Sequence, residues 1–247
     1  MHNEQFVKLI QPLSTLASYE VAIKETPKNA EPTSPGKRSK RAVGTYSKFW
    51  DNGRTLTVSF MEPLPDELEY RVEKIIRRWD PHHSLALDFV KSRPTDIRIY
   101  LGGKRNESYL GTDALAAPPN QPTLLVSTTP DHWSFECTLL HEFGHALGLQ
   151  HEHLHPHARI PWNKEKVYHF YQATQGWSKT DIDLNLFKIE NNSDTHIGPY
   201  DKKSIMHYRI PNELTHGNWQ VGDNLEISAQ DKINIRKIYP DAKSVII

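Results

Sequence analysis

Polar and apolar residues alternate in several short segments of the first half of the chain, which is the pattern of strands with one buried face. Leu56, Val58 and Phe60 alternate over 55–60, and the same spacing recurs at 85–89 and 97–101. Residues 123–127 form a short apolar run, and the polar stretch 108–114 is a candidate edge strand. These segments predict that the strands of the protein lie in its first half.

Helical spacing occurs twice in the same half. Apolar residues between 68 and 79 recur at i, i+4, i+7, i+8 and i+11, on one face of a helix. A second helix is expected from Asp131, a suitable N-cap, to Leu147. Periodicity is weaker after residue 152, where one helix is expected after Trp162 and a last one where Asp231 follows Ser228 by three residues. The order is strand, helix, strands and helix, followed by loops with short helices.

Composition narrows the function classes. The 247 residues carry 30 Lys and Arg against 30 Asp and Glu, so no net charge favours binding to nucleic acid. No apolar run approaches the roughly 18 residues of a membrane helix, so we expect no membrane insertion. Cys137 is the only cysteine, which excludes intramolecular disulfides and Cys-rich zinc sites. We expect a monomeric protein.

The N-terminal 41 residues are interpreted as a flexible extension or leader. Residues 1–25 lack the apolar core of a signal peptide, so we favour export without a visible signal, and a cytoplasmic location stays open. Residues 25–45 have the composition of a linker, and 37–41 is its most basic stretch. That stretch is either a solvated face or a protease-sensitive junction before a folded domain at 42–247.

The candidate chemistry lies in residues 141–151, in a region where histidine is concentrated. His141 and His145 are one helical turn apart and lie on one face, so both imidazoles can bind one metal ion. Gly148 can end the helix in a left-handed conformation and turn the chain, which brings His151 to the same ion. Three nitrogen ligands leave a fourth zinc position for water, as in catalytic sites. Glu142 lies beside the metal without having to ligate it. We predict one zinc ion per chain.

Three further histidines extend this run: His153, His155 and His157. They lack the helix-and-turn spacing of the first three. We expect them at the surface or supporting the ligands, because zinc-binding histidines need outer partners more than additional ligands.

The motif His141-Glu142-x-x-His145-x-x-Gly148-x-x-His151 resembles that of the metzincin zinc peptidases, and Glu152 directly after it is similar to astacins in particular. Residues 204–208, Ser-Ile-Met-His-Tyr, resemble the astacin Met-turn. The resemblance implies that Met206 lies beneath the metal, that Tyr208 can ligate zinc and move away during catalysis, and that Glu152 contacts the matured N-terminus. From the residues alone, core packing of Met206 and a buried hydroxyl at Tyr208 stay open.

The resemblance also implies the fold and the substrate edge. It implies an α+β, zincin-like architecture: an upper lobe, 42–151, with a twisted and mostly parallel five-stranded sheet and two helices, and an irregular lower lobe, 152–247. The substrate would pair with an edge strand that includes Ser108, Tyr109, Leu110, Gly111 and Thr112. Residues 161–163 and 225–239 are similar to bacterial and fungal members more than to animal ones.

The sequence departs from the family in two respects. The two disulfides common in astacins cannot form with one cysteine, and residues 1–41 lack the aspartate-bearing motif of animal propeptides. The activity implied is a zinc endopeptidase acting on proteins or peptides, with Glu142 as general base and Tyr208 stabilising the oxyanion. A hydrolase of other amides or esters and an inactive, zinc-stabilised peptide-binding module stay open. The presence of Glu142 argues against the module, because a structural zinc site needs no base.

Overall fold

A twisted six-stranded sheet forms the first layer of the protein. The computed structural model describes residues 8–30, 46–92, 94–188 and 198–241. The strands, in sheet order, are β1 (Lys8–Ile10), β5 (Asn106–Ser108), β6 (Leu124–Val126), β4 (Ile97–Leu101), β2 (Thr55–Phe60) and β3 (Ala86–Phe89). All neighbouring strands are parallel except β5 and β6. The mostly parallel sheet is confirmed, and residues 42–151 supply five of its strands, as expected. The sixth strand, β1, comes from the N-terminal extension.

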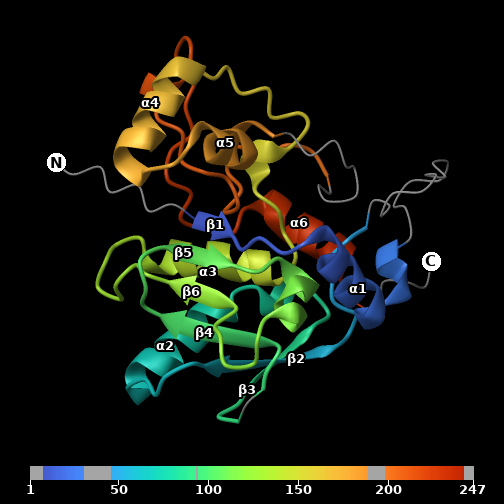
Figure 1. The fold of residues 1–247 in the computed structure, drawn as a ribbon. Helices are drawn as coiled ribbons and strands as arrows, with labels where there is room; N and C mark the ends of the chain where they lie inside the picture. Colours follow the sequence, from blue (N-terminus) through green and yellow to red (C-terminus); the bar gives the residue numbers. More distant parts are fainter. Residues whose placement is uncertain (1–7, 31–45, 93, 189–197, 242–247) are drawn as a thin grey trace.

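The described part of the extension, residues 8–30, is folded. The expectation that it is flexible is wrong for these residues. After β1 it forms helix α1 (Thr15–Glu25) and the 3-10 turn η1 (Pro27–Ala30). Helix α1 packs on η3 (Gly111–Ala116), where Ser18 and Ala22 become buried. Figure 1 shows α1 at one end of the sheet and β1 along its edge. The first residues of the linker expected at 25–45 form η1 instead. Residues 31–45, which include the basic stretch 37–41, lie outside the described residues.

Two helices cover the sheet, as expected. Helix α2 (Asp66–Ile76) packs against α3 (Phe135–Ala146), and α3 packs against β5 and β6. Helix α3 begins later than Asp131, because residues 131–134 form turns and Ser134 occupies the N-cap position. Every residue of α3 except Glu136 is buried. The largest fully buried side chains of this core are Trp50, Trp79, Phe135, Phe143 and Tyr239.

The second half of the chain forms an irregular lobe of short helices, as the weak periodicity indicates. Its elements are η4 (Glu152–Leu154), α4 (Lys164–Gln175), α5 (Lys179–Ile182), the π-helical turn η5 (Asp183–Phe187), η6 (Asn212–Leu214) and α6 (Ala229–Ile238). Ser228 and Asp231 form the expected capping box of α6. Helix α6 returns to the sheet lobe, where the Tyr239 hydroxyl donates to the Leu147 carbonyl at 2.8 Å. The short turn η2 (Asp80–His82) contacts α6.

The edge strand expected at 108–114 is wrong beyond Ser108. Gly111 has φ of +50°, and residues from Gly111 onward form η3. A Cβ at Gly111 would lie 1.9 Å from the Lys48 carbonyl oxygen, to which the Thr112 amide donates at 3.0 Å. The chain thus leaves the sheet after β5 and forms η3 against the backbone of Lys48.

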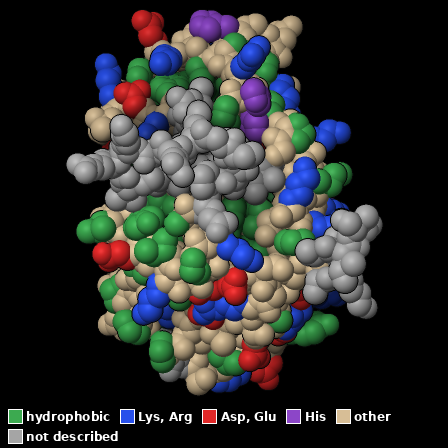
Figure 2. All heavy atoms as spheres, turned by 90° about the vertical axis from the view of Figure 1, so that its right-hand side faces the viewer, with side chains coloured by type: hydrophobic (Ala, Val, Ile, Leu, Met, Phe, Trp, Pro, Cys, Tyr) green, Lys and Arg blue, Asp and Glu red, His purple; other side chains and the backbone are tan. Residues whose placement is uncertain are grey.

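The surface carries charges of both signs. On the face in Figure 2, acidic and basic side chains are interspersed over the part that the structure describes. Within the described residues, no helix has both the length and the apolar character needed to cross a membrane.

Candidate metal centre

Helix α3 and the turn that follows it bring three imidazoles together. The rings of His141 and His145 are 4.7 Å apart, and that of His151 lies 5.3 and 4.4 Å from them. One nitrogen of each ring lies within 4.8 Å of the other two. Gly148, with φ of +95°, ends the helix as expected and redirects the chain. The Leu149 amide donates to the Gly144 carbonyl at 2.9 Å and fixes this turn.

Backbone carbonyls orient two of the rings. The Nδ1 atom of His141 is 2.7 Å from the Ile205 carbonyl oxygen, and that of His145 is 2.7 Å from the Leu149 carbonyl oxygen. A carbonyl only accepts, so Nδ1 carries the proton in both rings and Nε2 keeps its lone pair. Burial lowers the pKa of His145 to about 3 and also lowers those of His141 and His151. All three rings are therefore neutral at physiological pH, the form that binds metal.

The polar atoms at the centre fit a zinc ion. Nε2 of His141 and both carboxylate oxygens of Glu142 are buried without a hydrogen-bond partner among the described residues. Such orphaned groups are costly unless something binds them. Three neutral imidazole nitrogens aimed at one point, with a carboxylate beside them, are the donor set of a catalytic zinc site.

Glu142 is fully buried, and burial raises the pKa of its carboxyl well above the usual value. The positive charge of Lys8 opposes this rise. Burial therefore favours the protonated form of this carboxyl over the carboxylate.

Met206 packs against α3 at Gly144, directly before His145. A Cβ at Gly144 would lie 2.5 Å from the Met206 sulfur, so a side chain at this point of the helix would require Met206 to move. The turn is held by Asp231, whose carboxylate accepts from the Ser204 hydroxyl at 2.6 Å and the Ile205 amide at 2.8 Å. The sequence indicated Asp231 only as a helix cap. Its second role depends on the packing of α6, which spacing along the chain does not reveal.

Tyr208, in the C-terminal lobe, lies beside the imidazoles of the centre. Its ring is 4.5 Å from that of His151 and stacks on His153 at 4.3 Å. Its hydroxyl donates to the backbone carbonyl of Lys8. His153 and His155 are buried, and His157 is exposed at the surface. Support of the zinc ligands by the two buried rings stays a prediction.

Glu152 is buried next to the Met-turn. Its amide donates to the Met206 carbonyl at 3.0 Å, and its carboxylate accepts from the Asp201 amide at 2.7 Å. Burial raises the pKa of Glu152 to about 8. Its contact with a matured N-terminus at residue 42 stays a prediction, because residue 42 lies outside the described part of the chain.

Only part of the predicted substrate edge lies on a strand. Ser108 belongs to β5, whereas Tyr109 and Leu110 follow it and Gly111 and Thr112 begin η3. The strand itself includes Asn106 and Glu107, which the sequence analysis missed because they precede the polar stretch. The outer edge of β5 is paired with β1.

Among solved structures, one close relative of the chain has the same fold. The structure of myroilysin matches with a TM-score of 0.74 and 39% sequence identity, over 78% of this chain and 96% of that chain. The chain belongs to the astacin-like zinc metalloproteases. Zinc is the cofactor of this family, and His141, His145 and His151 are positioned to hold it.

Curated astacin-like relatives are more distant. The zinc metalloproteinase nas-38 of Caenorhabditis elegans is 26% identical over 70% of this chain and 22% of its own length. The astacin-like metalloprotease toxin 1 of Loxosceles intermedia is 25% identical over 68% of this chain and 57% of its own length. The chain thus spans about a fifth of the length of nas-38 and somewhat over half of the length of the toxin. No family model matches it. The greater similarity to bacterial and fungal members stays a prediction.

Proposed function

We propose that the chain is a zinc endopeptidase that hydrolyses peptide bonds of proteins, with Glu142 as the general base. The observation that carries the proposal is the buried carboxylate of Glu142, without a partner among the described residues, next to three converging imidazoles. Bound by these imidazoles, zinc supplies a Lewis acid and lowers the pKa of its water toward about 7.

Glu142 handles the proton. Its carboxylate takes a proton from the attacking water and passes it to the leaving amine. The apolar surroundings of α3 favour the neutral acid, so the carboxyl can hold this proton while the peptide bond breaks.

Tyr208 and β5 bind the peptide. The Tyr208 hydroxyl already donates to a backbone carbonyl, that of Lys8, and the same bond to a scissile carbonyl would stabilise the oxyanion. The pairing of β1 with β5 supports main-chain recognition of an extended peptide at this edge. Recognition through the main chain makes weak demands on the sequence of the substrate.

Substitution of Glu142 by Gln tests the proposal. The amide keeps the size of the side chain but cannot accept the proton, so casein cleavage should fall about 10²- to 10⁴-fold. Bound zinc, measured by elemental analysis, should stay at one per chain. The exposed Glu213→Gln is the matched control and should cleave like the parent. Equal cleavage by Glu142→Gln and the parent would exclude Glu142 as the base. A chain that binds zinc and peptides but never cleaves them, even without residues 1–41, would instead be a peptide-binding module.

A further inference from the structure

His153, two residues after the last of the three converging imidazoles, is buried against the side chain of Tyr208. The two rings are stacked, with their centroids 4.3 Å apart and their planes at 24°. The ring of His153 also lies 5.2 Å from that of His151. Only 3% of the surface of His153 is exposed. This histidine therefore contacts the proposed oxyanion donor face to face from within the C-terminal lobe.

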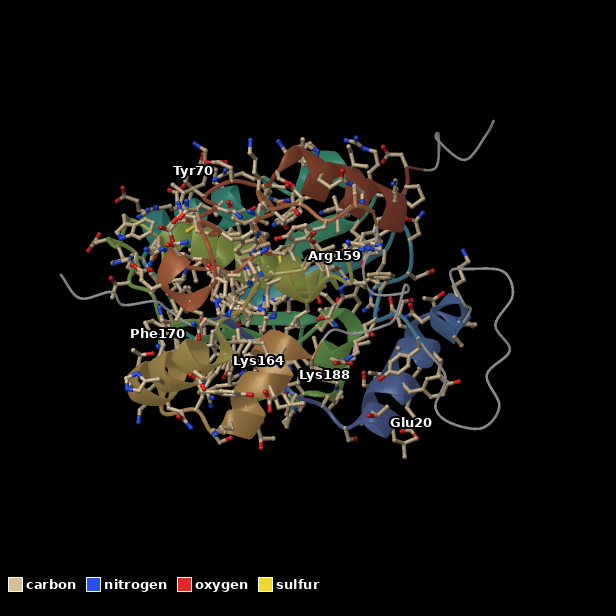
Figure 3. The ribbon with its side chains drawn as sticks, turned by 90° about the horizontal axis from the view of Figure 1, so that it is seen from above. Glu20, Tyr70, Arg159, Lys164, Phe170 and Lys188 are labelled. Carbon is tan, nitrogen blue, oxygen red and sulfur yellow. The ribbon has the colours of Figure 1, made fainter. Side chains whose placement is uncertain are left out.

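The π-helical turn η5 fixes the ring of His153. Its Nε2 atom is 2.8 Å from the carbonyl oxygen of Asn185, and because a carbonyl only accepts, Nε2 donates. The Lys188 amide donates to the Asp183 carbonyl at 2.8 Å and closes the turn around Asn185. Figure 3 labels Lys188, directly after η5, on the same side of the molecule as Phe170 of α4. The orientation of the His153 ring is thus set by an element of the C-terminal lobe.

The main chain of Tyr208 is held separately from its ring. The Nδ1 atom of His207 donates to the Tyr208 carbonyl at 2.7 Å, so its Nε2 atom accepts from the Tyr200 hydroxyl at 2.8 Å. With the main chain fixed, the direction of the phenol depends on the rings that contact it. The ring of His151 is inclined to that of Tyr208 at 61°, and the ring of His153 lies on its face.

A tyrosine that stabilises an oxyanion needs this kind of support. The donor must already lie in place when the charge develops, within a fraction of an ångström. The hydroxyl of Tyr208 is at the end of a long side chain, so a small rotation of the ring displaces it. Stacking restrains the ring without using the hydroxyl, which stays able to donate to a carbonyl, as it does to that of Lys8.

We propose that His153 is a positioning residue of the protease, whose ring, fixed by the Asn185 carbonyl, holds the phenol of Tyr208 in the direction in which its hydroxyl meets the carbonyl of a bound peptide. The inference rests on the proposed function. It adds a residue that acts through Tyr208 and binds neither the metal nor the substrate itself.

The test uses full-length, zinc-loaded chains carrying His153→Ala, His153→Phe or the exposed control His157→Ala, each with and without Tyr208→Phe. Phenylalanine keeps a flat ring for stacking but cannot donate to Asn185. Circular dichroism and zinc content establish that each chain is folded and loaded. In chains labelled with fluorotyrosine, the fluorine NMR signal that Tyr208→Phe removes reports on this ring without any turnover. The values of kcat and KM are measured with a casein peptide.

His153→Ala should shift and broaden the Tyr208 signal. It should lower kcat about two- to tenfold, as expected for the loss of one aromatic pair, and leave KM nearly unchanged. In the Tyr208→Phe chain the same substitution should lower kcat no further, because the hydroxyl that His153 positions is already absent. His153→Phe should keep most of the parent kcat, and His157→Ala should match the parent in every measurement.

Two results would overturn the role of His153. One is an unchanged Tyr208 signal in His153→Ala. The other is an equal fall in kcat with and without the Tyr208 hydroxyl, which is the result expected of a residue that only stabilises the fold. If the signal responds as expected but no chain cleaves the peptide, the proposed function fails, and only the support of the Tyr208 ring by His153 stands.

Discussion

At the scale of single residues, burial decides the protonation of the ionisable groups. The three ligand imidazoles are neutral because α3 and the Met-turn exclude water from them, and the same exclusion raises the pKa of Glu142. Backbone carbonyls then select the tautomer of His141 and His145. The chemistry of the centre therefore comes from its enclosure as much as from the residue types.

His83 shows the same effect away from the metal and gives a prediction for pH. It is buried near the ring of Tyr239, and burial lowers its pKa below the usual 6.5. A lowered histidine pKa favours the neutral form in the folded state. The contribution to stability is therefore complete above about pH 6.5 and is lost as the pH falls below it, by at most about 1.4 kcal/mol per pH unit.

Urea unfolding at pH 7.5, 6.0 and 5.0, at fixed zinc concentration, measures this contribution. The free energy of unfolding of His83→Gln should fall less steeply toward low pH than that of the parent. His216→Gln, at an exposed position, should follow the parent. Contributions that the proteins share cancel in the comparison, so parallel curves for His83→Gln and the parent would contradict the prediction.

At the scale of elements, two glycines with positive φ distinguish backbone strain from steric exclusion. A Cβ at Gly111 would lie 1.9 Å from the Lys48 carbonyl oxygen, whereas no described atom lies within 4 Å of one at Gly53. Gly53→Ala should cost only the conformational penalty of about 1–2 kcal/mol. Gly111→Ala should cost about 3 kcal/mol or more, because the backbone of Lys48 must move. Thermal unfolding of both variants compares the two, and equal losses would show that the Lys48 contact is dispensable.

Elements whose signals are local were predictable, and those that depend on distant contacts were not. The two histidines of α3, the glycine that ends it and the box that caps α6 are set by spacing within one or two helical turns. The predicted strand 108–114 failed because Lys48, far along the chain, draws Gly111 into η3. The start of α3 was placed too early because Asp131 has the residue type of a cap but lies in a turn.

At the scale of the whole molecule, the largest difference from expectation is the folded extension. A three-residue strand such as β1 has no periodicity to detect, and it forms because β5 offers a free edge. Helix α1 is held by residues that follow the extension in the chain. The Ser18 hydroxyl donates to Asp113 at 2.5 Å, and Glu25 pairs with Arg54. The extension is therefore bound to the rest of the protein by noncovalent contacts in addition to its covalent link.

A bound extension should stay in place after the chain is cut. Trypsin cleaves after lysine and arginine, and the basic stretch 37–41 provides such sites outside the described elements. The cut chain should elute as one complex in size-exclusion chromatography at low salt, because β1 and α1 keep their contacts. High salt should weaken the complex, since the Arg54 side chain of the ion pair is partly exposed.

Two substitutions on α1 make this prediction specific. Glu25→Ala removes the partner of Arg54, which is also held by Asp96, and should weaken the cut complex roughly tenfold. Glu20→Ala removes the same charge from an exposed position of the same helix and should have no effect. Identical dissociation constants for the two variants would show that the Glu25–Arg54 pair does not hold the extension. Immediate separation of the cut parent would show that the extension needs its covalent link. In the expected case, cutting the chain between residues 30 and 46 alone does not release β1 and α1 from the sheet.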